Sequence, residues 1–244
     1  MSYSPLRSYF LYTLGFPNLE FLIEQYLEGK HYQIEAVIKD GKIAYDMVMH
    51  YPNPCQSSLF GLPLGSYMIA FEDEVYKKAH AALVRLIAVI PHIKNKTMFY
   101  EFVYMDDEIY IMEACTRKSG VPCQRFFYES TGMNFEEALV KLAMDRTDFY
   151  IAPAHTFKKN VGYVMYMENT GIISRKNPYP DITSKIEEVN MVALGDVLKL
   201  SDKQMRRDKS LLVFLENEDR CKLASDIELL LKWQPFEYST VLDS

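Results

Sequence analysis

The sequence lacks a long hydrophobic run, because its longest runs, such as Leu211 to Leu215, are far shorter than the roughly 20 apolar residues that a membrane helix needs. It also lacks a basic excess: 27 lysines and arginines stand against 33 aspartates and glutamates, a net charge of −6. Proteins that bind a nucleic-acid backbone use positive charge to do so. We therefore expect no membrane partner and no nucleic-acid partner.

Cysteine is scarce as well. The four cysteines, Cys55, Cys115, Cys123 and Cys221, lie far apart without a Cys-X-X-Cys pair, and the N-terminus shows no charged-then-apolar signal pattern. These absences predict a reducing, cytoplasmic location. With 244 residues, of which 49% are hydrophobic and 25% charged, the chain fits one large globular domain or two small ones.

Alternating and helical patterns of apolar residues are present along most of the chain. They predict an α+β fold with a mainly antiparallel sheet, flanking helices and a small C-terminal cap. The predicted helices cover 74–90, 134–144 and 218–233, and a loop covers 52–65. The predicted strands cover 21–38 with a break at 28–30, 43–49, 98–105, 108–115, 162–167, 171–174, 187–194 and 211–216.

The predicted hairpin over 98–115 carries the most informative side chains. Glu101 lies in its first strand and Glu113 in its second, so the two carboxylates can converge on one cation. Two hard oxygen ligands suit Mg²⁺, which is commonly completed by water and substrate phosphates. Arg117, beyond the strand end, could reach a phosphate. Spacing alone also fits a solvated hairpin whose two glutamates and arginine bind nothing.

Two segments in order resemble the ATP-grasp ligases, particularly the branch of biotin carboxylase and the carboxylate–amine ligases. The first, Leu22 to Gly29, is similar to the family's hinge strand, whose backbone binds the adenine edge. The second joins Phe99-Tyr100-Glu101-Phe102 to the stretch from Ile111 to Arg117, with the two glutamates spaced as in the family. The resemblance covers roughly residues 18–235 and identifies the C-terminal portion of such a ligase.

The resemblance implies a binding site for ATP. Glu24 and the backbone of Gln25 and Leu27 would line the adenine slot, and His31 would lie near the ribose hydroxyls. An imidazole can donate to a hydroxyl or accept from one, which suits that place. The residues themselves leave open that His31 is a half-exposed strand histidine.

The resemblance also implies a metal site and one catalytic residue. Glu101 and Glu113 would hold Mg²⁺ between the phosphates of ATP, and Arg117 would stabilise an acyl-phosphate intermediate. Cys115 departs from the pattern, because the family has asparagine there and a thiol is a poor ligand for Mg²⁺. Catalysis is expected to be weakened or lost if that ligand matters. A separate hypothesis makes Cys115 a nucleophile beside His50 or His155.

The resemblance divides the chain into a remnant of a preceding lobe (1–18), the C-terminal ATP-grasp lobe (19–157) and a cap subdomain (158–244). The family's N-terminal lobe closes lysines and a glycine-rich loop over the phosphates, and nothing before Leu19 supplies them. We therefore expect the C-terminal half of an ADP-forming ligase that acts on small-molecule carboxylates and amines. The alternative is a non-catalytic module that serves as partner or scaffold. A protein partner or second copy could cover the surface left by the missing lobe.

Overall fold

The computed structural model describes residues 25–52, 64–90, 93–120, 123–146, 148–167, 170–198 and 209–239. Glu24, the predicted remnant over 1–18 and most of the predicted loop over 52–65 lie outside the described residues. Within the described part, no helix is long and apolar enough to cross a membrane.

The molecule is built on one large sheet whose strand pairs are all antiparallel. It has eight strands in the order β5-β4-β1-β2-β3-β6-β10-β8. Their bounds are β1 Lys30–Lys39, β2 Lys42–Tyr51, β3 Gly65–Met68, β4 Lys96–Met105, β5 Glu108–Cys115, β6 Asn160–Met167, β8 Lys185–Asn190 and β10 Lys209–Asn217. A smaller sheet joins β7 (Gly171–Lys176), β9 (Val197–Leu198) and β11 (Phe236–Ser239).

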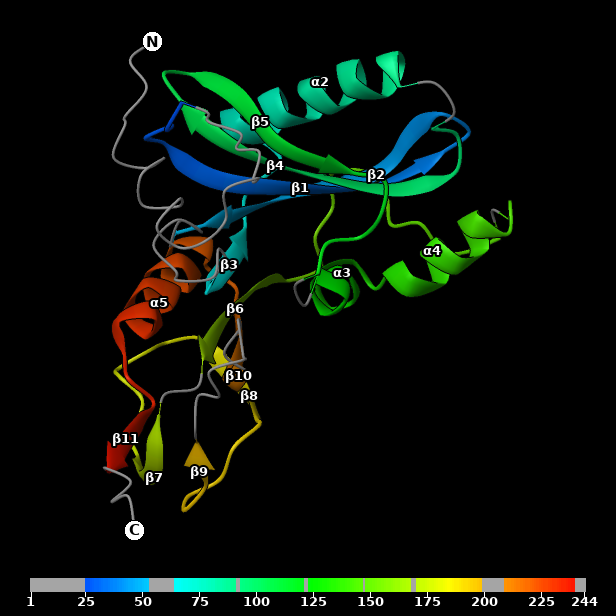
Figure 1. Cartoon of the computed structure of the whole chain (residues 1–244). Coiled ribbons are helices and arrows are strands. Elements are labelled where there is room, and N and C mark those ends of the chain that lie inside the picture. The colour runs from blue at the N-terminus through cyan, green and yellow to red at the C-terminus, as the bar shows by residue number, and fades with distance from the viewer. Residues whose placement is uncertain are drawn as a thin grey trace, which may run out of the picture.

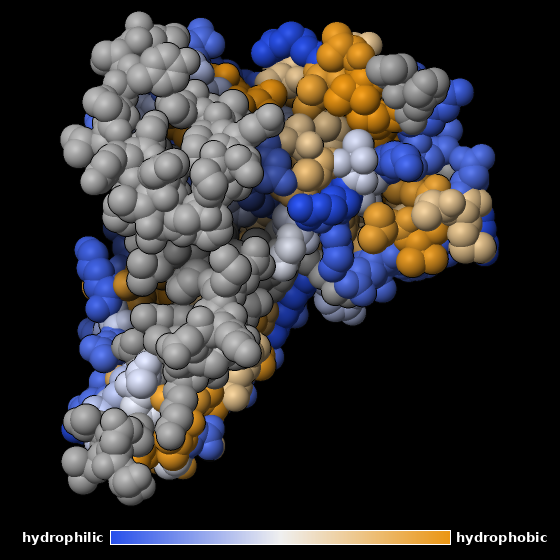
Figure 2. Space-filling view, viewed as in Figure 1, coloured by the Kyte–Doolittle hydropathy of each residue, from blue (hydrophilic) through white to orange (hydrophobic). Residues whose placement is uncertain are grey.

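Helices cover both faces of the large sheet (Figure 1). Helix α2 (Glu74–Val89) lies on one face of β1, β2 and β4, while α3 (Cys123–Thr131) and α4 (Phe135–Ala143) lie on the other side. Helix α5 (Arg220–Lys232) packs against β3, β6 and β10. Figure 2 shows hydrophobic side chains at the surface over α2 and α4.

The alternation of β1 separates two environments, because successive side chains of a strand point to opposite faces. Ile34, Ala36 and Ile38 are buried against a cluster that includes Ala79 and Leu83 of α2. The even-numbered positions of β1 therefore belong to a hydrophobic core. The start of helix α2 is fixed by Asp73, whose carboxylate accepts the backbone N–H of Val75 at 2.8 Å.

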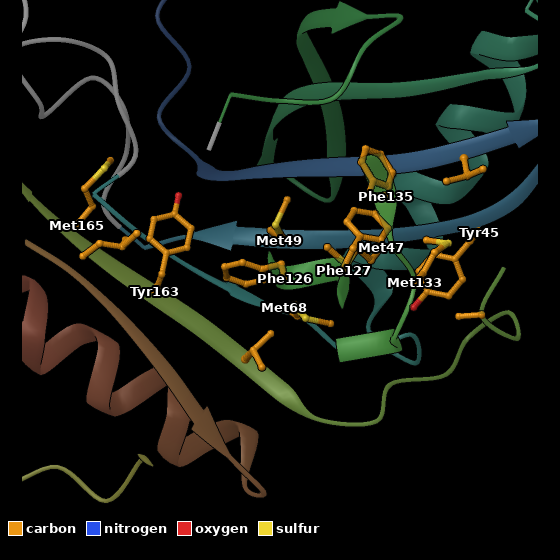
Figure 3. Packing of buried hydrophobic residues seen from close by; sticks show 14 of the residues in the cluster. Tyr45, Met47, Met49, Met68, Phe126, Phe127, Met133, Phe135, Tyr163 and Met165 are labelled. Carbon is orange, nitrogen blue, oxygen red and sulfur yellow. The ribbon is translucent and has the colours of Figure 1, made fainter. Parts of the chain in front are cut away.

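A second core fills the space between β2, β3, β6 and the α3–α4 pair (Figure 3). Phe127 of α3 is fully buried and stacks on Phe135 of α4 with ring centroids 4.3 Å apart. Asn134 is the N-cap of α4, and its side-chain oxygen accepts the backbone N–H of Glu137 at 3.0 Å. Further buried members include Tyr45, Met47, Met49, Met68, Phe126, Met133, Tyr163 and Met165.

A third core joins α5 to β6 and β10, and it requires a close approach at Gly162. A Cβ at this position would lie 2.3 Å from the end of the Ile227 side chain and 3.0 Å from the backbone oxygen of Ser66. Since β6, β8 and β10 all follow residue 157, the C-terminal part of the chain extends the large sheet and adds the small one. The predicted domain boundaries at residues 18 and 157 stay predictions.

Candidate functional site

The hairpin of β4 and β5 places Glu101 and Glu113 directly opposite each other. Its turn residues, Asp106 and Asp107, both have positive φ (52° and 63°), a conformation that aspartate tolerates in two-residue turns. Opposed residues of an antiparallel pair present their side chains on one face. Both carboxylates therefore lie on the same side of the sheet, with side-chain exposures of 25% and 54%.

The neighbouring strand continues this polar row across the sheet. Gln33 of β1 pairs with Glu101, so the odd-numbered residues of β1 share the face of the two glutamates. His31, Gln33 and Glu35 are 5%, 0% and 0% exposed. Buried polar groups of this kind require hydrogen-bond partners, which makes this face of the sheet a candidate site rather than a second hydrophobic surface.

A chain of hydrogen bonds runs through these buried side chains. The hydroxyl of Tyr51 donates to Oε1 of Gln33 at 2.5 Å, and Nε2 of Gln33 donates to Oε1 of Glu35 at 2.7 Å. The same Glu35 oxygen accepts the backbone N–H of Ser119 at 2.9 Å. Glu35 therefore fixes the segment that follows β5 against the sheet.

That segment places Arg117 beside Glu113. Its guanidinium carbon lies 4.9 Å from the ring centroid of Phe99, and Nη2 lies 3.8 Å from Oε1 of Glu113. Nη1 donates to the backbone oxygen of Lys118 at 2.9 Å. The side chain stays 58% exposed, so the guanidinium can meet an anionic ligand beside Glu113.

His31 lies at the other side of the pair. Its Nε2 is 3.6 Å from Oε2 of Glu101, which is an ion-pair distance rather than a hydrogen bond. The imidazole meets the ring of Tyr51 edge-on at 5.3 Å between centroids. At 5% exposure, His31 is not the half-exposed strand histidine that the sequence left open.

The expected hinge covers residues 22–29, of which the structure describes 25–29. This part is an irregular run that leads into β1, so the strand predicted over 25–27 is wrong. Leu27 is half-buried and lines a cavity of about 720 Å³ together with His31 and Tyr104, whereas Gln25 is exposed and does not line it. Gly29 allows the run to approach β4, because a Cβ there would lie 2.6 Å from the backbone oxygen of Tyr104. Two of the predicted nucleotide residues thus share one cavity.

Comparison with known proteins gives matches among solved structures. No protein-family model matches the chain, and no curated protein matches it either. A phosphoribosylglycinamide synthetase from Anaerococcus prevotii superposes with a TM-score of 0.62 at 13% identity, over 89% of this chain and 55% of that one. An L-amino acid ligase from Bacillus licheniformis gives 0.65 at 13% identity, over 89% and 54%.

A biotin carboxylase from Campylobacter jejuni, in a complex with β,γ-ATP, gives a TM-score of 0.56 at 14% identity, over 88% of this chain and 48% of that one. The fold is that of an ATP-grasp lobe. The resemblance predicted from the hinge and hairpin motifs is confirmed at the level of the fold. The chain spans about half the length of these solved structures.

The pair of opposed side chains, Glu101 and Glu113, brings two carboxylates to one face of the sheet. Within the residues that the structure describes, no group of three or more histidine, cysteine, aspartate or glutamate side chains could hold a metal ion. Mg²⁺ is usually held by one or two protein carboxylates, with phosphate and water oxygens in the other positions. Glu101 and Glu113 therefore fit Mg²⁺ delivered with a nucleotide better than a metal held by protein alone.

Cys115 follows Glu113 on the same face of the lobe. Its thiol donates to Oε1 of Glu113 at 3.0 Å, and this hydrogen bond, with burial, raises the pKa of the thiol above its usual value. His50 lies on the α2 face, where its ring contacts those of Tyr32 and Tyr67. A protonated thiol with its carboxylate neighbour is a poor nucleophile, so the geometry does not favour the cysteine hypothesis.

Proposed function

We propose that the chain is the C-terminal half of an ATP-dependent carboxylate–amine ligase that forms ADP through an acyl phosphate. The observation that carries the proposal is the opposition of Glu101 and Glu113 with Arg117 at their side. The structural neighbours support it, since they include a protein named as an L-amino acid ligase and one named as a phosphoribosylglycinamide synthetase. Small-molecule carboxylates and amines are the proposed substrates.

Each residue of the site has a role in this proposal. Glu101 and Glu113 would hold Mg²⁺ against the phosphates of ATP, and Leu27 with His31 would bind the adenosine part. ATP would supply the phosphoryl group that activates the carboxylate. Arg117 would meet the negative charge on the transferred group, and such catalysis depends mainly on positioning and charge. Glu35 would act indirectly, by holding the segment that carries Arg117.

The proposal is tested by titrating the chain with ADP and with ATP in a calorimeter, with Mg²⁺ and with EDTA. We expect binding only with Mg²⁺ and only in the high micromolar range, because the described residues form one wall of a site and a single wall leaves the phosphates hydrated. Binding that is equal in Mg²⁺ and EDTA would contradict the metal assignment.

Glu113→Gln should weaken Mg²⁺-dependent ADP binding by at least about tenfold, because one of two anionic oxygen ligands becomes neutral. Glu108→Gln is the matched control: Glu108 is exposed at the turn end of the same strand and should bind as the wild type does. Equal affinities for the two variants would remove Glu113 from the site. Thermal unfolding of both variants without ligand checks that the hairpin is intact.

The alternative function, a non-catalytic module that acts as partner or scaffold, is favoured by Cys115 at the family's asparagine position. Cys115→Asn distinguishes the two. If the thiol alone has weakened a nucleotide site, the amide oxygen should increase the stabilisation by Mg²⁺ and ADP. If the half-buried Cys115 only packs, the variant should lose about 1 kcal/mol of stability without any response to ligand. Thermal unfolding with and without ligand measures both.

A further inference from the structure

On the α2 face of the sheet, away from the glutamate pair, a buried carboxylate holds a histidine. Asp46 of β2 is 4% exposed, and its Oδ2 accepts Nδ1 of His80 at 2.8 Å. Its other oxygen accepts the hydroxyl of Tyr76 at 2.8 Å. Since a carboxylate only accepts, Nδ1 of His80 carries the hydrogen, and Nε2 of the neutral ring carries the lone pair.

A second imidazole comes from a distant part of the chain. His155 lies in a turn with a φ of 58°, and its ring centroid is 6.2 Å from that of His80. The rings of Tyr76 and Phe71 contact the His155 ring, with centroids 5.8 Å and 5.4 Å away. Two imidazoles that bind one ion through nitrogens about 2.1 Å away have centroids roughly 5–6 Å apart, so a small rotation of the exposed His155 ring meets this geometry.

We propose that His80 and His155 together bind a divalent transition-metal ion of the zinc, nickel or copper class. Neutral imidazole nitrogens suit these metals, and a carboxylate that accepts the other ring N–H is the usual partner of a metal-binding histidine. Asp46 is thus a positioning residue: it fixes the tautomer and orientation of His80. The site lies on the opposite face of the sheet from Glu101 and Glu113, so it does not depend on the proposed ligase activity.

Two protein ligands leave coordination positions open. Within the described residues, no third histidine, cysteine or carboxylate completes the set. His155 also lines a cavity of about 550 Å³, whose wall includes Phe157, Lys158 and Arg220. The same wall also includes Glu72, Glu216 and Glu218, so it carries both signs of charge. Water from that cavity would fill the open positions.

The test is a calorimetric titration with Zn²⁺ at pH 8 in a non-chelating buffer. It uses the Glu101→Gln/Glu113→Gln chain as the background, so that the glutamate pair does not compete. We expect one Zn²⁺ per chain with a dissociation constant in the micromolar range, and at least about tenfold weaker binding after His155→Gln. His50→Gln is the matched histidine control and should change nothing. His155 is exposed, so its variant is expected to fold.

Asp46→Asn should weaken Zn²⁺ binding by about 10–100-fold, as is typical for loss of such a partner. Electron paramagnetic resonance of bound Cu²⁺ gives a second readout: two coordinated imidazoles in the background chain, one after His80→Gln or His155→Gln, and altered hyperfine values after Asp46→Asn. Absence of saturable Zn²⁺ binding, or equal affinity after His155→Gln, would overturn the proposal.

Discussion

Replacing Asp226 by alanine should lower the free energy of unfolding by about 3 kcal/mol. The residue lies on the buried face of α5 and is 4% exposed. One oxygen, Oδ2, accepts the backbone N–H and the hydroxyl of both Thr183 and Ser184, at 2.7–3.1 Å. Burial opposes the charge, yet these hydrogen bonds outweigh it and lower the pKa of Asp226. The alanine variant would leave the two donors of the buried Ser184 without their acceptor, whereas the exposed Thr183 can donate to water instead.

Urea unfolding measures this loss. Asp226→Asn should lose less, about half, because one oxygen acceptor remains in place. Glu228→Ala, at an exposed position of the same helix, should stay within about 0.5 kcal/mol of the wild type. A loss below about 1 kcal/mol in Asp226→Ala would show that the link between α5 and the start of β8 contributes little to stability.

Stability should fall by about 3 kcal/mol as the pH is lowered from 6.5 to 4, because of His50. Burial of its ring, partly opposed by a contact of Nδ1 with the backbone oxygen of His31 at 3.1 Å, lowers the pKa of His50 from 6.5 to about 4. In that window the unfolded chain binds a proton that the folded chain does not. His50 therefore stabilises the fold above pH 6.5, and this contribution is lost as the pH falls toward 4.

Urea unfolding at several pH values, compared with His50→Gln, isolates this effect because carboxylates common to both proteins cancel. Titration of His80 does not contribute to the loss of stability between pH 6.5 and 4. Its hydrogen bond to Asp46 outweighs burial and raises the pKa of His80, so its contribution is complete below 6.5 and fades only at higher pH. The same slope between pH 6.5 and 5 in wild type and variant would contradict the assignment.

Features set by local sequence were predictable. The helix predicted over 74–90 corresponds to α2 (Glu74–Val89), and the strands predicted around the Asp106-Asp107 turn correspond to β4 and β5. A helix cap, the helical spacing of apolar residues and a two-residue turn each involve only a few neighbouring residues, so they can be predicted from the sequence. The opposition of Glu101 and Glu113 follows from that turn.

Features set by distant contacts were not predictable. Helix α3 is not among the predicted helices, since Phe126 and Phe127 are adjacent aromatic residues that form no helical stripe. They are buried because α3 packs over β2 and β6. Gln33 and Glu35 lie at the polar positions of the alternating pattern that predicts a strand after residue 30, and that pattern alone does not indicate burial. Their burial depends on Ser119, 84 positions later in the chain than Glu35, which covers that face.

Strand β3 is the short connection between the two parts of the large sheet. Its four residues form two pairs with β2 and three with β6, whereas the neighbouring strands pair over much longer stretches. Among the described residues, the half of the sheet that carries the glutamate pair is therefore joined to the half that carries α5 through few ladder pairs. Leu231 of α5 packs over Gly65 of β3, where a Cβ would lie 3.1 Å from the end of the Leu231 side chain. We therefore expect the two parts of the large sheet to rotate relative to each other at β3 more readily than either part deforms.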